Sequence, residues 1–120
     1  MANLVVWANI PVKDMARAKS FYSALLGITM EETPGYGGAV AVPAGGEEGD
    51  VAFNLLAGGD FAPSPDGVRI VFSANGDIDG MLARGEAAGG KVVQPPEQMG
   101  PIGTFAQLMD SEGNIISLMQ

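Results

Sequence analysis

A repeat with a spacing of 63 residues limits the folds open to this chain of 120 residues. Asp14 and Asp77 are both suited to cap a helix, because a carboxylate accepts the free N–H groups of the first helical turn. Gly27 and Gly90 can each supply the left-handed residue that stops a helix. Both pairs are 63 residues apart, and apolar residues recur at helical spacing between cap and stop. The sequence therefore predicts two copies of one unit.

Each unit is predicted to be a β-α-β-β-β module, which places the chain in the α+β class. In the first module we expect a helix at Met15–Leu26 and strands at Leu4–Ile10, Ile28–Glu32, Ala39–Val42 and Val51–Leu56. In the second we expect a helix from Ile78 to the stop at Gly89 and Gly90, with strands at Val68–Ser73, Lys91–Gln94, Gly103–Met109 and Asn114–Met119. The prediction is a single domain over 1–120, with module 1 at 1–56, a Gly- and Pro-rich linker at 57–66 and module 2 at 67–120. A module of this size is marginal alone, so the two should share one core.

The composition excludes several kinds of site. The chain contains neither histidine nor cysteine, so it has no Ser-His-Asp or Cys-His arrangement, no thiolate chemistry and no imidazole metal ligand. Any metal ion would be held by oxygen atoms alone, which favours Mg²⁺ or Ca²⁺ over zinc.

The charge and hydropathy limit the partners. A net charge of −8 makes nucleic acid a poor partner, because lysine and arginine supply most of the affinity for phosphates. The acidity either favours a cationic ligand or simply maintains solubility. No apolar run reaches the roughly 18–20 residues of a membrane helix, and the N-terminus lacks the pattern of a secretory signal. We therefore expect a soluble cytoplasmic protein that binds neither nucleic acid nor membrane.

Each module contains short motifs of its own. They are Ile10–Asp14, Arg17–Tyr22 and Leu26–Gly27 in module 1, and Asp77–Asp79, Glu86–Lys91 and Asp110–Asn114 in module 2. With the repeated βαβββ order, they resemble the vicinal oxygen chelate superfamily of glyoxalase I, extradiol dioxygenases and bleomycin-resistance proteins. The resemblance implies an incomplete barrel, in which two sheets curl around a central ligand pocket, usually within a homodimer.

The resemblance also implies where a metal ion would bind. Metal-dependent members hold the ion with side chains from four strands, and the corresponding positions here are Trp7, Asn54, Ile70 and Ser117. Tryptophan and isoleucine cannot be ligands, and neutral amide and hydroxyl oxygens bind a divalent ion weakly without a carboxylate. We therefore predict no metal and no cofactor, and we doubt the metal-dependent activities as a group.

Alternation along the strands extends these four positions to a predicted pocket lining. The expected ligand-binding residues are Trp7, Asn9, Asn54, Ile70, Phe72, Phe105, Gln107 and Ser117. Arg69 is expected to point outward, without a role, and no catalytic residue is assigned. The alternative is that Trp7, Ile70 and Phe72 fill the barrel as core.

Three functions remain open. The first is a metal-independent protein that binds a small aromatic or cationic molecule between the modules, like the bleomycin-resistance proteins. The second is a metal-free lyase or isomerase of the glyoxalase-like group. The third is a structural or interaction dimer with a filled pocket.

Overall fold

The computed structural model describes residues 4–34, 39–58 and 62–120, so residues 59–61 of the expected linker lie outside it. Module 1 contains β1 (Trp7–Val12), α1 (Met15–Leu26), β2 (Met30–Pro34), β3 (Ala39–Pro43) and β4 (Ala52–Ala57). Module 2 contains β5 (Val71–Ser73), α2 (Ile78–Ala87), β6 (Lys91–Gln98), β7 (Thr104–Met109) and β8 (Ile115–Met119), with a short 3-10 helix at Gly100–Ile102 between β6 and β7. The predicted βαβββ order is confirmed in both modules.

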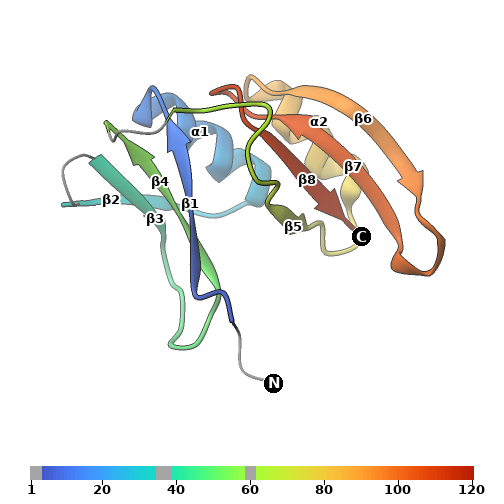
Figure 1. Cartoon of the computed structure of the whole chain (residues 1–120), viewed down its shortest axis with the longest axis horizontal. Coiled ribbons are helices and arrows are strands. Elements are labelled where there is room, and N and C mark those ends of the chain that lie inside the picture. Colours follow the sequence, from blue (N-terminus) through green and yellow to red (C-terminus); the bar gives the residue numbers. More distant parts are fainter. Residues whose placement is uncertain (1–3, 35–38, 59–61) are drawn as a thin grey trace.

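Each module forms one mixed sheet of four strands. Sheet A has the order β1-β4-β3-β2, and sheet B has the corresponding order β5-β8-β7-β6. The first and last strands of each module pair in parallel, and the other neighbours are antiparallel. Figure 1 shows the two sheets beside each other, with the helices behind them. The sheets do not close into a barrel, and the α+β class is confirmed.

The helix ends follow from their caps. The carboxylate of Asp14 accepts the N–H of Arg17 at 3.1 Å, and Gly27 stops α1 with φ of 66°. The carboxylate of Asp77 accepts the N–H of Gly80 at 3.1 Å. Helix α2 ends at Ala87, and of the two expected stop residues it is Gly89 that takes the positive φ of 105°.

All eight strands differ from their expected bounds by at least one residue, and three of the differences are informative. Strand β1 continues through Pro11 to Val12, beyond its expected end at Ile10. An edge strand tolerates a proline, because one side of the strand has no neighbouring strand to which an N–H group would donate. Strand β6 passes through Pro95 and Pro96 at the edge of sheet B for the same reason, with irregular register. Strand β5 is only three residues long.

The helices bury one core between the modules. The ring of Tyr22 on α1 lies 5.7 Å from that of Phe53 in sheet A and 6.1 Å from that of Phe72 in sheet B, measured between centroids. The module 2 backbone also approaches α1 closely. A Cβ atom at Gly90 would lie 2.7 Å from Cε1 of Phe21, so only glycine fits there without a shift.

The turn between β7 and β8 is attached to the N-terminus of α1 through Glu112. Its carboxylate accepts the N–H groups of Lys13 and Asp14 at 2.9 and 2.8 Å and the Nε–H of Arg17 at 2.7 Å. Burial alone would raise the pKa of Glu112, but the hydrogen bonds from Arg17, from the two backbone groups and from Ser111 outweigh it and lower the pKa to about 2. A side chain of module 2 thus caps a helix of module 1.

Asp110 makes a second connection from the same turn. Its carboxylate accepts the O–H of Tyr22 at 2.5 Å and the N–H groups of Glu112 and Asn114 at 2.8 and 2.9 Å. Burial, with the nearby charge of Asp110, raises the pKa of Tyr22 well above its usual value, so the phenol stays protonated and donates.

Neither of the two helices is long and apolar enough to span a membrane in the part of the chain that the structure describes.

Candidate functional site

The outer side of sheet A carries Trp7, and we call it the Trp7 face. Strands β1 and β4 pair in parallel with Trp7 opposite Ala52 and Asn9 opposite Asn54. Because side chains alternate along a strand, these four residues lie on one side of the sheet. The intervening residues, among them Ile10 and Leu55, are buried in the core. The predicted residues Trp7, Asn9 and Asn54 thus share one side of sheet A.

A cavity of about 590 Å³ lies on the Trp7 face. It is lined by Val6, Trp7, Asn9, Thr33, Val40, Val42, Asp50, Ala52, Asn54 and Leu56. Pockets of roughly 300–1,000 Å³ with mostly apolar walls and few polar groups are typical of sites for small molecules. The side chain of Trp7 is 58% exposed, so its ring is open to a ligand.

Two amides of this lining, Asn9 and Asn54, contact each other. The Nδ2 group of Asn54 donates to Oδ1 of Asn9 at 3.3 Å, across the β1–β4 pair. They make no other side-chain hydrogen bond to the described residues, so each amide keeps polar atoms available to a ligand.

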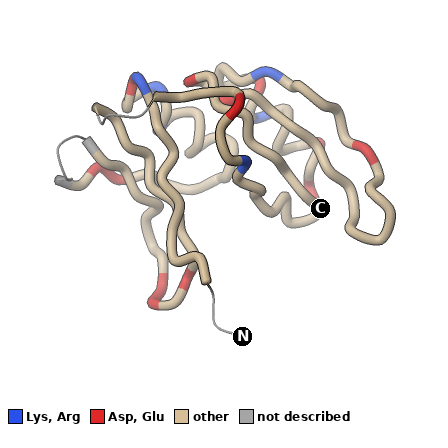
Figure 2. Tube along the Cα trace, viewed as in Figure 1, with Lys and Arg blue, Asp and Glu red and all other residues tan. Residues whose placement is uncertain are grey.

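The charged groups around the Trp7 face are acidic. Asp50 lines the cavity, and Glu31 lies opposite Val42 in the β2–β3 pair, on the same side of the sheet. Figure 2 shows further acidic residues in the β3–β4 loop at the lower end of sheet A, where Glu47 and Glu48 are exposed. Among the described lining residues none is basic.

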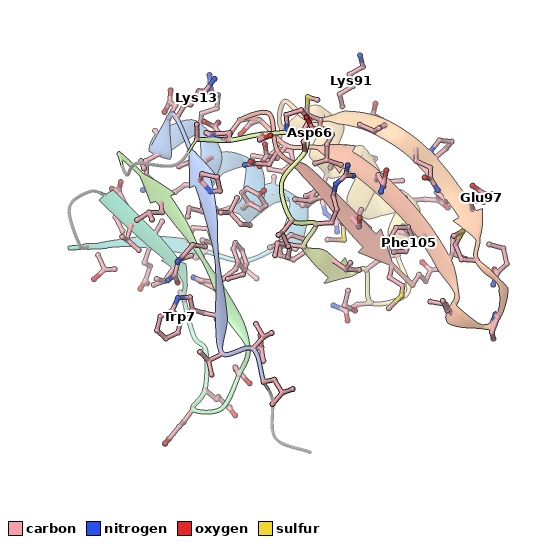
Figure 3. The ribbon with its side chains drawn as sticks, viewed as in Figure 1. Trp7, Lys13, Asp66, Lys91, Glu97 and Phe105 are labelled. Atoms are coloured by element: carbon pink, nitrogen blue, oxygen red, sulfur yellow. The ribbon has the colours of Figure 1, made fainter. Side chains whose placement is uncertain are left out.

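Sheet B holds the other predicted site residues. Gln107 pairs with Ser117, and Ser117 pairs with Val71, so the three share one side of the sheet. Phe105 and Gln107 are half-buried, whereas Ser117 is only 1% exposed. In Figure 3, Trp7 points away from the sheet that carries Phe105. The predicted residues are therefore divided between two sheets and do not enclose one pocket within this chain.

The face expected for β5 is wrong. The ring of Phe72 packs against Tyr22 and Phe53, at a centroid distance of 5.2 Å from Phe53, and Ile70 also packs against the core. Because Ile70 and Phe72 face the core, the alternate residues Arg69 and Val71 lie on the side of Ser117. Arg69, which was expected to point away from the site, therefore takes the position assigned to Ile70.

One additional residue explains this difference. Lys13 alone separates buried Val12 from the cap of α1, whereas two residues separate buried Ala74 from the cap of α2. The two residues before the cap of α2 are Asn75 and Gly76, both with positive φ, at 49° and 81°. The prediction counted the same number of residues back from each cap, so its assignment of β5 was wrong by one residue. An error of one residue exchanges the two faces of a strand.

Ile70 does meet Asn9 at a smaller cavity. This cavity of about 300 Å³ lies where β1, the segment before β5 and the start of β8 come together, and Ile115 also lines it. Its walls are largely apolar, and it adds no charged side chain to the site.

The four positions that would hold a metal ion do not suit one. Trp7 and Ile70 offer no lone pair, and Arg69, which takes the place assigned to Ile70, is a cation. Asn54 and Ser117 offer only neutral oxygen atoms. In the described ranges, no cluster of three or more His, Cys, Asp or Glu side chains could hold a metal ion.

Sequence reasoning missed the contribution of β2, β3 and the β3–β4 loop. Val40 lies opposite Thr33 and also opposite Leu56, which brings both hairpin strands onto the Trp7 face. The alternation of Val40 and Val42 signals such a face, but which side they take depends on the register of the β2–β3 pair. Asp50 carries no such signal in the sequence.

The fold and motifs belong to a known family. The model of the Glyoxalase/Bleomycin resistance protein/Dioxygenase superfamily matches residues 4–118, so the chain is a member of this superfamily. The predicted resemblance is confirmed.

Relatives with similar sequences carry different descriptions. The putative glyoxylase CFP32 of Mycobacterium bovis is 31% identical over 121 residues, which cover 95% of this chain and 44% of that protein. The chain thus spans less than half of this curated relative. The solved structure of TnmS3, an antibiotic binding protein from Streptomyces sp. CB03234, is 28% identical with a TM-score of 0.75 over 98% of this chain and 95% of that one. A glyoxalase/bleomycin resistance protein from Albidiferax ferrireducens T118 shares the fold, with a TM-score of 0.77 at 23% identity over 98% of both chains.

Proposed function

We propose that this protein binds a small aromatic molecule on the Trp7 face without a metal ion. The observation that carries the proposal is the exposed indole of Trp7 above a cavity of about 590 Å³ with apolar walls. An indole ring stacks on flat aromatic ligands and attracts cations to its face. The antibiotic-binding description of TnmS3 agrees with such a role.

The carboxylates beside the cavity favour an aromatic ligand that also carries a positive charge. Asp50 and Glu31 lie on the side of Trp7, and the whole chain has a net charge of −8. A negative potential raises the local concentration of cations and lowers that of anions.

The proposal requires no metal ion, because the side chains at the four relevant positions lack the carboxylate and imidazole groups that hold one. The acidic groups Asp50 and Glu31 lie on different elements, the β3–β4 loop and β2, rather than as a pair aimed at one point. Stacking and hydrogen bonding are therefore the interactions that this site offers.

We further propose that the protein acts in the cytoplasm as a homodimer, as the family resemblance suggests. Exposed apolar side chains support this. Leu4, Val5 and Val6 precede β1, Val68 precedes β5, and Val71 is the first residue of β5. Apolar residues at two sheet edges form a surface suited to a second copy of the chain.

Replacement of Trp7 by alanine is expected to weaken binding of a flat aromatic cation such as proflavine by about tenfold or more, because stacking and cation–π attraction are lost. Isothermal titration calorimetry in the presence of EDTA measures the affinity. Val93→Ala is the matched control, because Val93 is a half-exposed apolar residue on sheet B. Equal affinities for the wild type and Trp7→Ala would contradict the proposal.

A further inference from the structure

The two amides on the Trp7 face form a neutral polar pair. Asn54 uses one N–H to reach Oδ1 of Asn9 and keeps its own carbonyl oxygen, while Asn9 keeps its NH₂ group. If the O and N atoms of both amides are exchanged, Asn9 becomes the donor and Asn54 the acceptor. In either case, one amide carbonyl and one complete NH₂ group remain free on the side of sheet A that carries Trp7, which precedes Asn9 by two residues on β1.

We infer that the Asn9–Asn54 pair selects ligands whose flat edge carries an N–H donor beside a carbonyl acceptor, the edge of a lactam or imide. The ligand N–H donates to the free amide carbonyl, and the ligand carbonyl accepts from the free NH₂ group. This inference rests on the proposed function, since the same ligand stacks on Trp7.

Because both amides are neutral and offer both a donor and an acceptor, a carboxylate or an ammonium group of a ligand does not match the pair. A carboxylate edge has no N–H for the free amide carbonyl, and an ammonium edge has no acceptor for the free NH₂ group. A carboxylate therefore leaves the free carbonyl without a donor, and an ammonium leaves the free NH₂ group without an acceptor. The acidic groups Asp50 and Glu31 belong to other elements, so they can attract a positive charge elsewhere on the ligand without changing the edge that the amides select.

Three small probes of one shape test this inference. 2-Quinolinone carries the adjacent N–H and C=O groups, 1-methyl-2-quinolinone lacks the N–H, and quinoline lacks both. Trp7 is the only tryptophan of the chain, so its single indole N–H cross-peak in a ¹H–¹⁵N spectrum reports binding at this face. The two Asn side-chain NH₂ cross-peaks report contact with the pair.

For the wild-type protein, 2-quinolinone is expected to bind about tenfold more tightly than 1-methyl-2-quinolinone, because the methylated probe leaves one amide unpaired. In Asn54→Leu, which keeps the size of the side chain, the two affinities should agree within about twofold. Ser20→Ala is the control, since it removes an exposed polar group on α1, outside the lining of the cavity, and should preserve the preference.

The outcomes separate this inference from the proposed function. If both quinolinones move the Trp7 cross-peak with equal affinity, or if the preference persists in Asn54→Leu, the inference is overturned and aromatic binding stands. If no probe moves that cross-peak, both are overturned.

Discussion

Replacing Glu112 with alanine should lower the free energy of unfolding by about 2–4 kcal/mol, because the change leaves two N–H groups at the start of α1 without their acceptor. The side chain of Glu112 is buried and accepts the N–H groups of Lys13 and Asp14, from the other module. Urea denaturation at neutral pH measures the change. Glu86→Ala is the matched control, since Glu86 is exposed on α2, and it should change stability by less than about 0.5 kcal/mol.

The same residue predicts a dependence on pH. The pKa of Glu112 in the folded protein is about 2, below its usual value of 4.5, so folding favours the charged form. The stabilisation is fully present above pH 4.5 and is lost as the pH falls toward 2, by about 3 kcal/mol in total. The stability difference between wild type and Glu112→Ala should therefore narrow over this range. A difference independent of pH would contradict the role of the carboxylate.

Phe72→Ala is expected to destabilise the protein by about 2–4 kcal/mol, because truncation of a core phenyl ring removes apolar contacts and leaves a cavity. The ring packs against Tyr22 and Phe53 on both sides of the inter-module core. Thermal unfolding by calorimetry, with urea denaturation, measures the loss.

The neighbouring Val71→Ala is the control for this change. Val71 lies on the other face of β5 and is 47% exposed, so its truncation should cost less than about 1 kcal/mol. If Phe72 lay on the outer face of β5, as the sequence predicted, the result would be reversed. Phe72→Ala would then lower the stability only slightly, and Val71→Ala would lower it more.

The helices could be predicted because their signals are local. The caps Asp14 and Asp77 and the apolar residues between caps and stops determine α1 and most of α2 through contacts within a few residues. The order of helix and strands along each module followed from the repeat and from the family resemblance. The ends of β1 and β6 could not be predicted, because a proline is tolerated only where a strand lies at an edge.

The site was predicted only in part, because one additional residue before a helix changes which residues of the preceding strand face the core. On β1 and β4 the alternation placed Trp7, Asn9 and Asn54 on one face, and the structure agrees. On β5 the count from the helix cap passed through Asn75 and Gly76 without allowing for an additional residue. An Asn-Gly pair is itself a turn signal, so the information was present in the sequence.

The division of the predicted residues between two sheets could not be predicted from alternation. Alternation assigns residues to a face, but it does not say toward which element that face is turned. The direction of the Trp7 face is decided by the packing of α1 against both sheets, through Tyr22, Phe53 and Phe72.

The most direct test of metal-independent aromatic binding on the Trp7 face is a ¹H–¹⁵N titration of the metal-stripped protein with proflavine in EDTA. We expect the largest shifts at the Trp7 indole N–H and at the backbone amides of β1, β3 and β4, with the same affinity after addition of Zn²⁺ or Mg²⁺. Shifts confined to sheet B, or binding that appears only when a metal ion is added, would contradict the account.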